Sequence, residues 1–368
     1  MAGLDGTYLD QYIFHGGGNK SDYFAIMRGS YGILQFGRDS MRAGMAPVME
    51  AELLAKVKDF TNLPKVTVIS NGGVTLSASR LPLPMVTSQA TSAFHSTVRL
   101  QAQATFEITP NLNESNGVSA ASQFARQLDE AEEAILNSLE GGLATILFGK
   151  RTQVGPSTHP YAFDTAADAY NVDIPAGISE PDKKDLIWGR VFAKLPSILK
   201  RNKVKENAIG FIGSPELEGI QTELAKYDAA NAKNENQFQK GLAVYASTAI
   251  AIGDGIIGQP AIIAKAFAMP KYTFGVTSWV SKAALDALPG HDIDLASVVL
   301  PKSGIRAEVQ LSKTHPDKSA FSGGGVVDRT EKYTVVVDLI VATAYNPAPT
   351  TQVSPVHLFQ FRDNVNQA

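Results

Sequence analysis

The sequence predicts an α+β fold, and three stretches of the chain support that prediction. Residues 96–109 alternate apolar and polar side chains as a half-buried strand does, and residues 119–143 repeat apolar side chains at a helical period. From residue 295 onward the chain is mostly β-forming. Because both patterns are unbroken over many residues, we expect one long strand and one long helix.

The composition is that of an ordinary globular protein. The chain has 368 residues, of which 44% are hydrophobic and 19% charged, with a formal net charge of -3. This length allows a large core and indicates about two or three structural units. The lack of cysteine excludes thiolate catalysis and disulfides, and the lack of a basic field argues against sequence-specific nucleic-acid binding.

The N-terminal residues 1–46 are predicted to form an extended arm, followed by a short helix in residues 47–60. No positive region precedes an apolar run there, so a secretory signal is not expected. The arm carries aromatic side chains that fit neither a helical nor a strand period and need a surface to cover them, either the chain's own body or a neighbouring subunit: Tyr8, Tyr12, Phe14, Tyr23, Phe24, Tyr31 and Phe36.

A β-hairpin is predicted around Asn71, Gly72 and Gly73, because these residues suit a tight turn between two β-rich runs. The strand at residues 96–109 should bury one face and expose the other. At about 3.3 Å per residue it would reach roughly 40 Å and project beyond a compact body. The apolar face is Val98, Leu100, Ala102, Ala104, Phe106 and Ile108, and the polar face is Arg99, Gln101, Gln103, Thr105 and Glu107.

The helix at residues 119–143 should begin at Ser119 as N-cap and stop or kink at Gly141 and Gly142. Its polar side is expected to include Glu132 and Glu133 in solvent. Its buried stripe is predicted to be Phe124, Leu128, Ala131, Ile135 and Leu139.

Two further regions are predicted after this helix. A helix around residues 186–195 should end at Pro196, and "NAIGFIG" should be a buried strand that leads into a helix capped by Ser214 with Pro215 at its first position. The run "KYTVVVDLIVATAY" is apolar on both faces and predicts a central strand.

Gly253, Gly255 and Gly258 spell the G-x-G-x-x-G of a dinucleotide-binding turn, which raises the alternative of an α/β oxidoreductase. That fold needs an acidic residue about 20 positions later to hold the ribose. None occurs between Gly255 and Ala284. We therefore favour an apolar loop with tight turns and predict no cofactor.

Other searches for catalytic chemistry give no candidate. No serine lies in a nucleophile frame, and the pairs Glu132/Glu133 and Asp292/Asp294 suit solvated surface and loop positions. Catalytic and metal-binding residues are therefore predicted to be none. The histidines lack metal-ligand spacing and are interpreted as isolated surface or loop residues: His15, His95, His159, His291, His315 and His357.

The order of the elements resembles that of the major capsid proteins of tailed bacteriophages, the Hong Kong 97-type fold that encapsulin shells share. "NAIGFIGSPELEGIQTEL" is similar to the start of that family's A-domain, and the segment that ends in "SPVHLFQF", with Pro355, Val356 and Leu358, is similar to its final strand region. The resemblance implies an N-terminal arm at 1–60, an E-loop β-ribbon at 61–112, a P-domain spine helix and connection at 113–181, an A-domain at 182–290, and P-domain strands with the C-terminal tail at 291–368.

The resemblance implies a structural protein and not an enzyme. Copies would form hexamers and pentamers of an icosahedral virion shell around double-stranded DNA, assembled in the host cytoplasm with portal, scaffolding and decoration proteins as candidate partners and no membrane. Alternatives are an encapsulin-type compartment, the oxidoreductase and a tail-tube subunit.

The N-terminal arm and the ribbon are expected to make the contacts between subunits. Deleting residues 1–46 is expected to leave a soluble subunit that forms no stable shells. Candidate inter-subunit contacts are Tyr12, Phe14, Tyr23, Phe24, Arg80 and Arg99. Family members that crosslink use a lysine of this ribbon, and here Lys65, at its base, is the only one, so covalent crosslinking is not expected.

Overall fold

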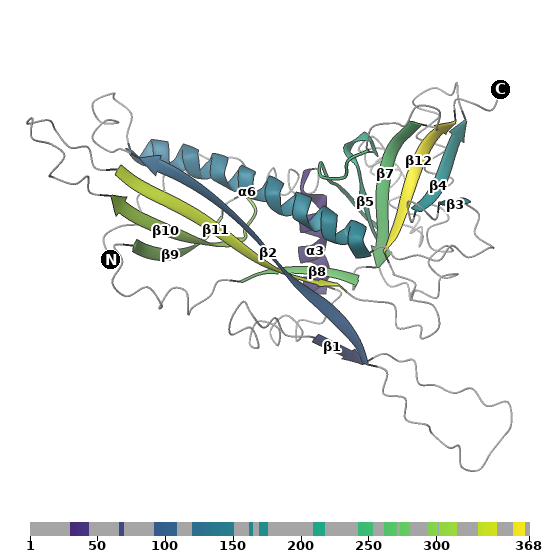
Figure 1. Cartoon of the computed structure of the whole chain (residues 1–368), viewed down its shortest axis with the longest axis horizontal. Coiled ribbons are helices and arrows are strands. Elements are labelled where there is room, and N and C mark those ends of the chain that lie inside the picture. The colour runs from purple at the N-terminus through teal and green to yellow at the C-terminus, as the bar shows by residue number, and fades with distance from the viewer. Residues whose placement is uncertain are drawn as a thin grey trace, which may run out of the picture.

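The computed structural model places two β-sheets along one long helix, α6 (Ala120–Lys150) (Figure 1). It describes residues 30–43, 66–69, 92–108, 120–150, 162–164, 169–175, 209–217, 242–252, 261–270, 273–279, 293–300, 302–314, 330–343 and 356–364. The expected helices at residues 47–60 and 186–195 and the glycines of the dinucleotide-like motif lie outside these ranges. No helix among the described residues is long and apolar enough to span a membrane.

The first sheet is antiparallel and lies along the N-terminal part of α6 (Figure 1). Its strand order is β1 (Val66–Ile69), β2 (Ser92–Ile108), β11 (Thr330–Thr343), β10 (Arg306–Thr314) and β9 (Ile293–Val299), and β8 (Phe274–Ser278) also pairs with β11. The predicted central strand is thereby confirmed, since β11 has β2 on one side and β10 and then β8 on the other.

The long strand β2 is confirmed together with its two faces. Ala102 and Ile108 are buried and Leu100 and Phe106 are partly buried on the side of α6, whereas the polar residues from Gln101 to Glu107 are exposed. Residues 96–108 pair with β11, and residues 92–95 continue past the end of β11 and pair with β1. The part of β2 that reaches beyond the β11 ladder is therefore short. The described partner of β1 is β2, and the hairpin turn expected at residues 71–73 lies outside the described residues.

An aromatic cluster fastens α6 to this sheet. The ring of Phe106 on β2 stacks on Tyr333 of β11 with centroids 5.3 Å apart, and Phe124 of α6 meets Tyr333 edge to face at 4.9 Å. Such aromatic pairs stabilise a fold beyond their buried area. The predicted stripe on α6 is confirmed, since all its residues are at least nine-tenths buried.

The expected stop of α6 at Gly141 and Gly142 is wrong, because the helix continues to Lys150. A Cβ at Gly142 would lie 2.6 Å from Cδ1 of Leu100 on β2, whereas a Cβ at Gly141 would meet nothing within 4 Å. Gly142 therefore allows the helix to approach the strand closely. The predicted N-cap, Ser119, lies outside the described residues.

The second sheet lies at the C-terminal end of α6 (Figure 1), where Phe148 meets Phe267 edge to face at 4.8 Å. Its order is β3 (Ala162–Asp164), β4 (Ala169–Pro175), β12 (His357–Asn364), β7 (Ala261–Pro270), β5 (Ile209–Gly213) and β6 (Leu242–Ala246). The pairs β4–β12 and β5–β6 are parallel and the other pairs are antiparallel.

The predicted buried strand at β5 is confirmed, and a 3-10 turn, η2 (Pro215–Leu217), follows it. Ser214 does not cap this turn with its side chain. Its Oγ accepts a hydrogen bond from the backbone N–H of Lys265 on β7 at 3.2 Å, so the serine joins two neighbouring strands. The helix expected after residue 217 lies outside the described residues.

The expectation of an extended arm through residue 46 is wrong at its end, because α3 (Gly32–Ala43) is a helix in the core. Ile33, Leu34 and Phe36 on it have no exposed surface. A Cβ at Gly32 would lie 2.2 Å from the carbonyl oxygen of Ala246, and one at Gly37 would lie 2.4 Å from Val276. These glycines take helix positions where an apolar side chain would otherwise mark the buried face. The helical repeat of apolar residues is therefore weak in the sequence, and the helix is hard to predict.

Candidate functional site: the junction of α6, α3 and the β9–β10 turn

Two buried glutamates on α6 organise the centre of the molecule. Glu132 is fully buried and Glu140 is 1% exposed, so the expectation that Glu132 lies in solvent is wrong; Glu133 is exposed as predicted. Eight residues are about 2.2 helical turns, so the two side chains point in directions about 80° apart around the helix axis. Each glutamate binds backbone N–H groups of a different segment, which makes α6 the common support for both.

Glu140 caps the beginning of α3. Its Oε1 accepts from the backbone N–H of Ile33 at 2.8 Å and its Oε2 from that of Leu34 at 2.9 Å. Ser247, just after β6, donates its hydroxyl to Oε1 at 2.5 Å. The first N–H groups of a helix have no partner within the helix, and here a carboxylate more than 100 residues away in sequence supplies it.

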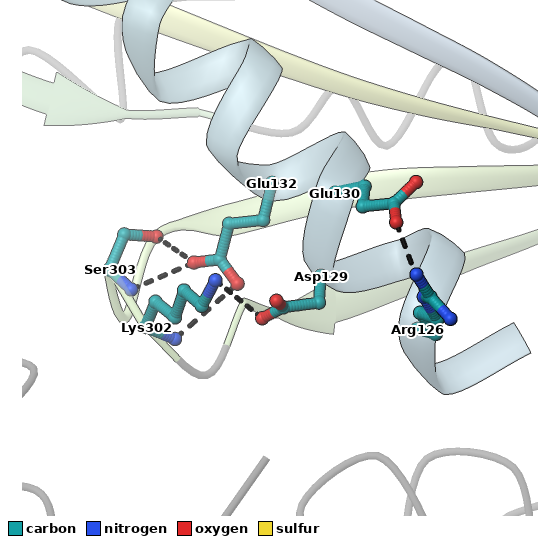
Figure 2. Close-up of polar contacts among 6 residues, drawn as sticks. All are labelled: Arg126, Asp129, Glu130, Glu132, Lys302 and Ser303. Atoms are coloured by element: carbon teal, nitrogen blue, oxygen red, sulfur yellow. Dashed lines mark hydrogen bonds and ion pairs between the residues drawn. The ribbon is translucent and has the colours of Figure 1, made fainter. Parts of the chain in front are cut away.

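Glu132 holds the turn between β9 and β10 (Figure 2). Its Oε1 accepts from the backbone N–H and the hydroxyl of Ser303, both at 2.8 Å, and its Oε2 lies 3.4 Å from the backbone N–H of Lys302. The Nζ of Lys302 forms an ion pair with Asp129, one turn earlier on α6, at 2.5 Å. Gly304 has φ +64°, a left-handed conformation that glycine adopts without strain.

α3 binds the carbonyl oxygens of the same turn. Arg38 donates to the carbonyl oxygens of Ser303 and Gly304. On the same helix Asp39 accepts from the hydroxyl of Tyr245 on β6 at 2.9 Å. α3 therefore joins α6, the first sheet and the second sheet at one place.

Burial dominates the electrostatics of this junction. It raises the pKa of Glu140 to about 7, although the hydrogen bonds from Ser247, Ile33 and Leu34 lower that pKa in part. Burial also raises the pKa of Tyr31, and the nearby glutamates raise it further. The hydrogen-bond partners of Glu140 are two backbone amides at the N-terminus of α3 and one hydroxyl, and all three donate to its carboxyl oxygens, which opposes the effect of burial.

Of the predicted contact residues, only Arg99 lies among the described ones. Its guanidinium forms an ion pair with Asp338 on β11, with Nη2 and Oδ1 3.0 Å apart, and its side chain is 29% exposed. Burial raises the pKa of Asp338, and Arg99 lowers it in part. Whether Arg99 also contacts a neighbouring subunit stays a prediction, as it does for Tyr12, Phe14, Tyr23, Phe24 and Arg80, which lie outside the described residues.

The segment after the glycine motif does not fit a dinucleotide site. In such a site the glycines lead directly into a helix whose N-terminus holds the pyrophosphate. Here residues 261–270 form strand β7, which pairs antiparallel with β5 and β12. A strand where a dinucleotide site has a helix therefore argues against the oxidoreductase alternative.

The other titratable candidates do not form a site within the described ranges. Those ranges contain no group of three or more His, Asp or Glu side chains placed to hold a metal ion. The reading of every histidine as a surface or loop residue is wrong for His357, which is fully buried in β12 and stacks on Tyr170 with ring centroids 6.0 Å apart. Asp294 lies in strand β9 and not in a loop.

Sequence reasoning missed Glu132 and Glu140, although a signal for them exists. Each follows a residue of the predicted stripe, Ala131 and Leu139, and therefore lies at the edge of the buried face. A carboxylate at such a position is buried only when another segment supplies donors. Those donors come from α3 and from residues 302–303, which are distant in sequence.

No protein-family model and no curated protein matches this chain. Among solved structures it is similar to the capsid structure of the cyanophage P-SCSP1u, at 9% identity over 82% of this chain and 83% of that chain, with a TM-score of 0.40. It is also similar to a structure from Mycobacterium phage Che8, at 10% identity over 84% and 87% with a TM-score of 0.41. The capsid of Ralstonia phage GP4 matches at 8% identity over 83% and 85%, with a TM-score of 0.39. The solved structures similar to this chain thus include bacteriophage capsids.

Proposed function

We propose that this chain is a structural subunit of an icosahedral capsid shell that encloses the double-stranded DNA of a tailed bacteriophage. The observation that carries the proposal is α6 laid along β2, with one sheet on each part of the helix (Figure 1). At 1.5 Å per residue this helix of 31 residues is about 46 Å long. Two sheets that pack on one continuous helix make an elongated unit, which suits a subunit that contacts several neighbours in a shell.

The order of elements along the chain supports the same function. The helix α3 comes first and a β-ribbon follows it, then come the long helix, the second sheet, and finally strands that return to both sheets. The Hong Kong 97-type fold has this order, with an E-loop, a spine helix, an A-domain and returning P-domain strands. We place the described β1 and residues 92–95 at the base of the E-loop.

In the proposed shell, copies assemble as hexamers and pentamers with arms and ribbons across their neighbours. A two-stranded ribbon such as β1 with residues 92–95 is only marginally stable by itself in water, so a neighbouring subunit would support it. Portal, scaffolding and decoration proteins are the further partners proposed, and the virion is the proposed location. The residues proposed for contacts between subunits are Tyr12, Phe14, Tyr23, Phe24, Arg80 and Arg99.

We propose no catalytic role for the buried carboxylates. The oxygens of Glu132 and Glu140 already accept hydrogen bonds from Ser303, Ile33, Leu34 and Ser247 of the same chain. A carboxylate whose oxygens already accept hydrogen bonds within the chain stabilises a junction and is not presented to a substrate.

Negative-stain electron microscopy of the protein expressed alone and with its neighbouring genes tests the proposal. Closed shells, or rings of five and six subunits, are the expected result. Shells with a packaged enzyme in place of DNA would instead identify an encapsulin-type compartment. Small monodisperse oligomers in both preparations would contradict the shell function, and saturable binding of NAD or FAD would then support the oxidoreductase.

A further inference from the structure

The last described strand of the chain lies inside the second sheet. β12 pairs in parallel with β4 on one side and antiparallel with β7 on the other. Apart from β12, the described partner of β4 is β3, a strand of three residues. Without β12 the described sheet would therefore separate into two parts, β3 with β4 and β7 with β5 and β6 (Figure 1).

β12 also supplies side chains to the cores on both faces of this sheet. Successive side chains of a strand point to opposite faces. Leu358 is buried in the large core that α6 shares. Phe359 and Phe361 have no exposed surface and belong to the smaller core. Both cores therefore lose apolar contacts when this strand is absent.

The neighbours of β12 fix which sequence fits between them and in which register. The rings of His357 and Phe359 both stack on Tyr170 of β4, with centroids 6.0 Å and 5.5 Å from that of Tyr170. On the other side, the pairing with β7 shifts between Phe361 and Arg362, as it does at a β-bulge. A bulge interrupts the regular repeat of the ladder, so a strand slipped by one or two residues would not fit.

We propose that β12 is the closing strand of the subunit. In this proposal, residues 170–175 of β4 and 261–268 of β7 form a binding site for the extended C-terminal segment, and the subunit is complete only when that segment has entered. Backbone hydrogen bonds on both sides supply the affinity of such a site, and alternate side chains supply its specificity. The proposal concerns the single subunit and is independent of the proposed function.

The order of the chain makes this strand the last to become available. β12 ends at Asn364 in a chain of 368 residues, and it follows every other described strand of its sheet. The first sheet has the same order, because β11, which lies between β2 and β10, is its last described strand. Neither sheet can therefore close until synthesis is nearly finished. A chain that lacks its C-terminal segment is thus excluded from assembly with complete subunits.

Cleavage of the folded full-length chain between β11 and β12 tests the closing strand. A protease recognition sequence inserted after residue 350 separates residues 351–368 from the rest and interrupts no described strand. We expect the cleaved segment to stay with the subunit during size-exclusion chromatography in native buffer. Once urea has removed it, the remainder should show no cooperative thermal unfolding in native buffer.

Refolding of the remainder together with a synthetic peptide of residues 351–368 should restore the melt of the cleaved subunit. A peptide with the same residues in scrambled order should not restore it. Two results would overturn the proposal: a remainder that has the wild-type melting temperature without any peptide, or equal recovery with both peptides.

Co-expression keeps the test decisive if the unfolded chain does not refold. Residues 1–350 and a tagged 351–368, made as separate chains in one cell, should purify together as a folded subunit. Phe361→Asp in the shorter chain places a charge in the core and should reduce the recovered complex roughly tenfold or more. Asn366→Asp adds the same charge beyond the end of β12 and should leave recovery unchanged. Failure of the unaltered chains to purify together, or full recovery with Phe361→Asp, contradicts the closing strand.

Discussion

Glu140 Oε1 and Ser247 Oγ lie 2.5 Å apart, although 107 residues separate them in sequence. Together with the hydrogen bonds from the two amides of α3, this contact joins α3 and the end of β6 to α6 through a single side chain. Glu132 does the same for the β9–β10 turn two helical turns earlier. The long helix therefore positions loops and a second helix through buried carboxylates as well as through its apolar stripe.

Replacement of Glu132 by alanine should strongly destabilise the subunit. The change leaves the backbone N–H and the hydroxyl of Ser303 without their acceptor in a buried place, and each such loss costs about 1–3 kcal/mol. We expect a decrease of about 2–4 kcal/mol in the free energy of unfolding, measured by urea denaturation. The control Glu133→Ala, at an exposed neighbouring position, should stay within about 0.5 kcal/mol of the wild type. Equal effects of the two substitutions would mean that Glu132 does not hold the turn.

Replacement of Arg99 by methionine should destabilise the subunit more at pH 7 than at pH 4.5. Without the guanidinium, the partly buried carboxylate of Asp338 has lost its ion-pair partner, and its already raised pKa should rise further. Since a raised carboxyl pKa favours the neutral form in the fold, acid should restore part of the lost stability. Thermal melts of both proteins at the two pH values measure this difference.

The control for this experiment is Arg126→Met. Arg126 pairs with Glu130 at 3.4 Å, but the two side chains are 84% and 67% exposed. An exposed pair of this kind contributes about 0–1 kcal/mol. A loss of stability in Arg99→Met that is the same at both pH values would exclude the link to Asp338.

The elements that are periodic in sequence could be predicted, and those made by distant contacts could not. The alternation of β2 and the stripe on α6 both report burial of a single face, so each is readable locally. α3 could not be predicted in this way, because Gly32 and Gly37 allow close contacts with Ala246 and Val276, which are distant in sequence and leave no local pattern.

The candidate site was missed for a related reason. A glutamate beside an apolar stripe is exposed in most helices, and its burial here depends on amides that arrive from elsewhere in the chain. His357 is a similar case, since it is buried where it pairs with Ala268 of β7 and stacks on Tyr170 of β4. Neither partner strand is near it in sequence, so no local pattern marks it.

Alanine substitutions at Gly141 and Gly142 test the contact between α6 and β2. Alanine favours a helix over glycine by about 1 kcal/mol. Gly141→Ala should gain this stability because its Cβ meets nothing within 4 Å. Gly142→Ala should instead be about 1–3 kcal/mol less stable than Gly141→Ala, because its Cβ would lie 2.6 Å from Leu100. Chemical denaturation measures both, and equal gains would show that the helix does not lie this close to the strand.

Two N-terminal truncations separate the role of the arm from that of α3. The sequence-based expectation that a subunit without residues 1–46 stays soluble changes with the structure, because this deletion removes Ile33, Leu34 and Phe36 from the core. It also removes the donors of Glu140. We expect that variant not to fold, as judged by circular dichroism and size-exclusion chromatography.

Deletion of residues 1–29 keeps α3 and should give a subunit with a wild-type melting temperature. If the arm contributes contacts between subunits, as we propose, electron microscopy of this shorter deletion should show isolated subunits or capsomers and few closed shells. Complete shells would remove Tyr12, Phe14, Tyr23 and Phe24 from the required contacts and leave the ribbon as the main link. An unfolded product would show instead that residues before α3 belong to the core of the subunit.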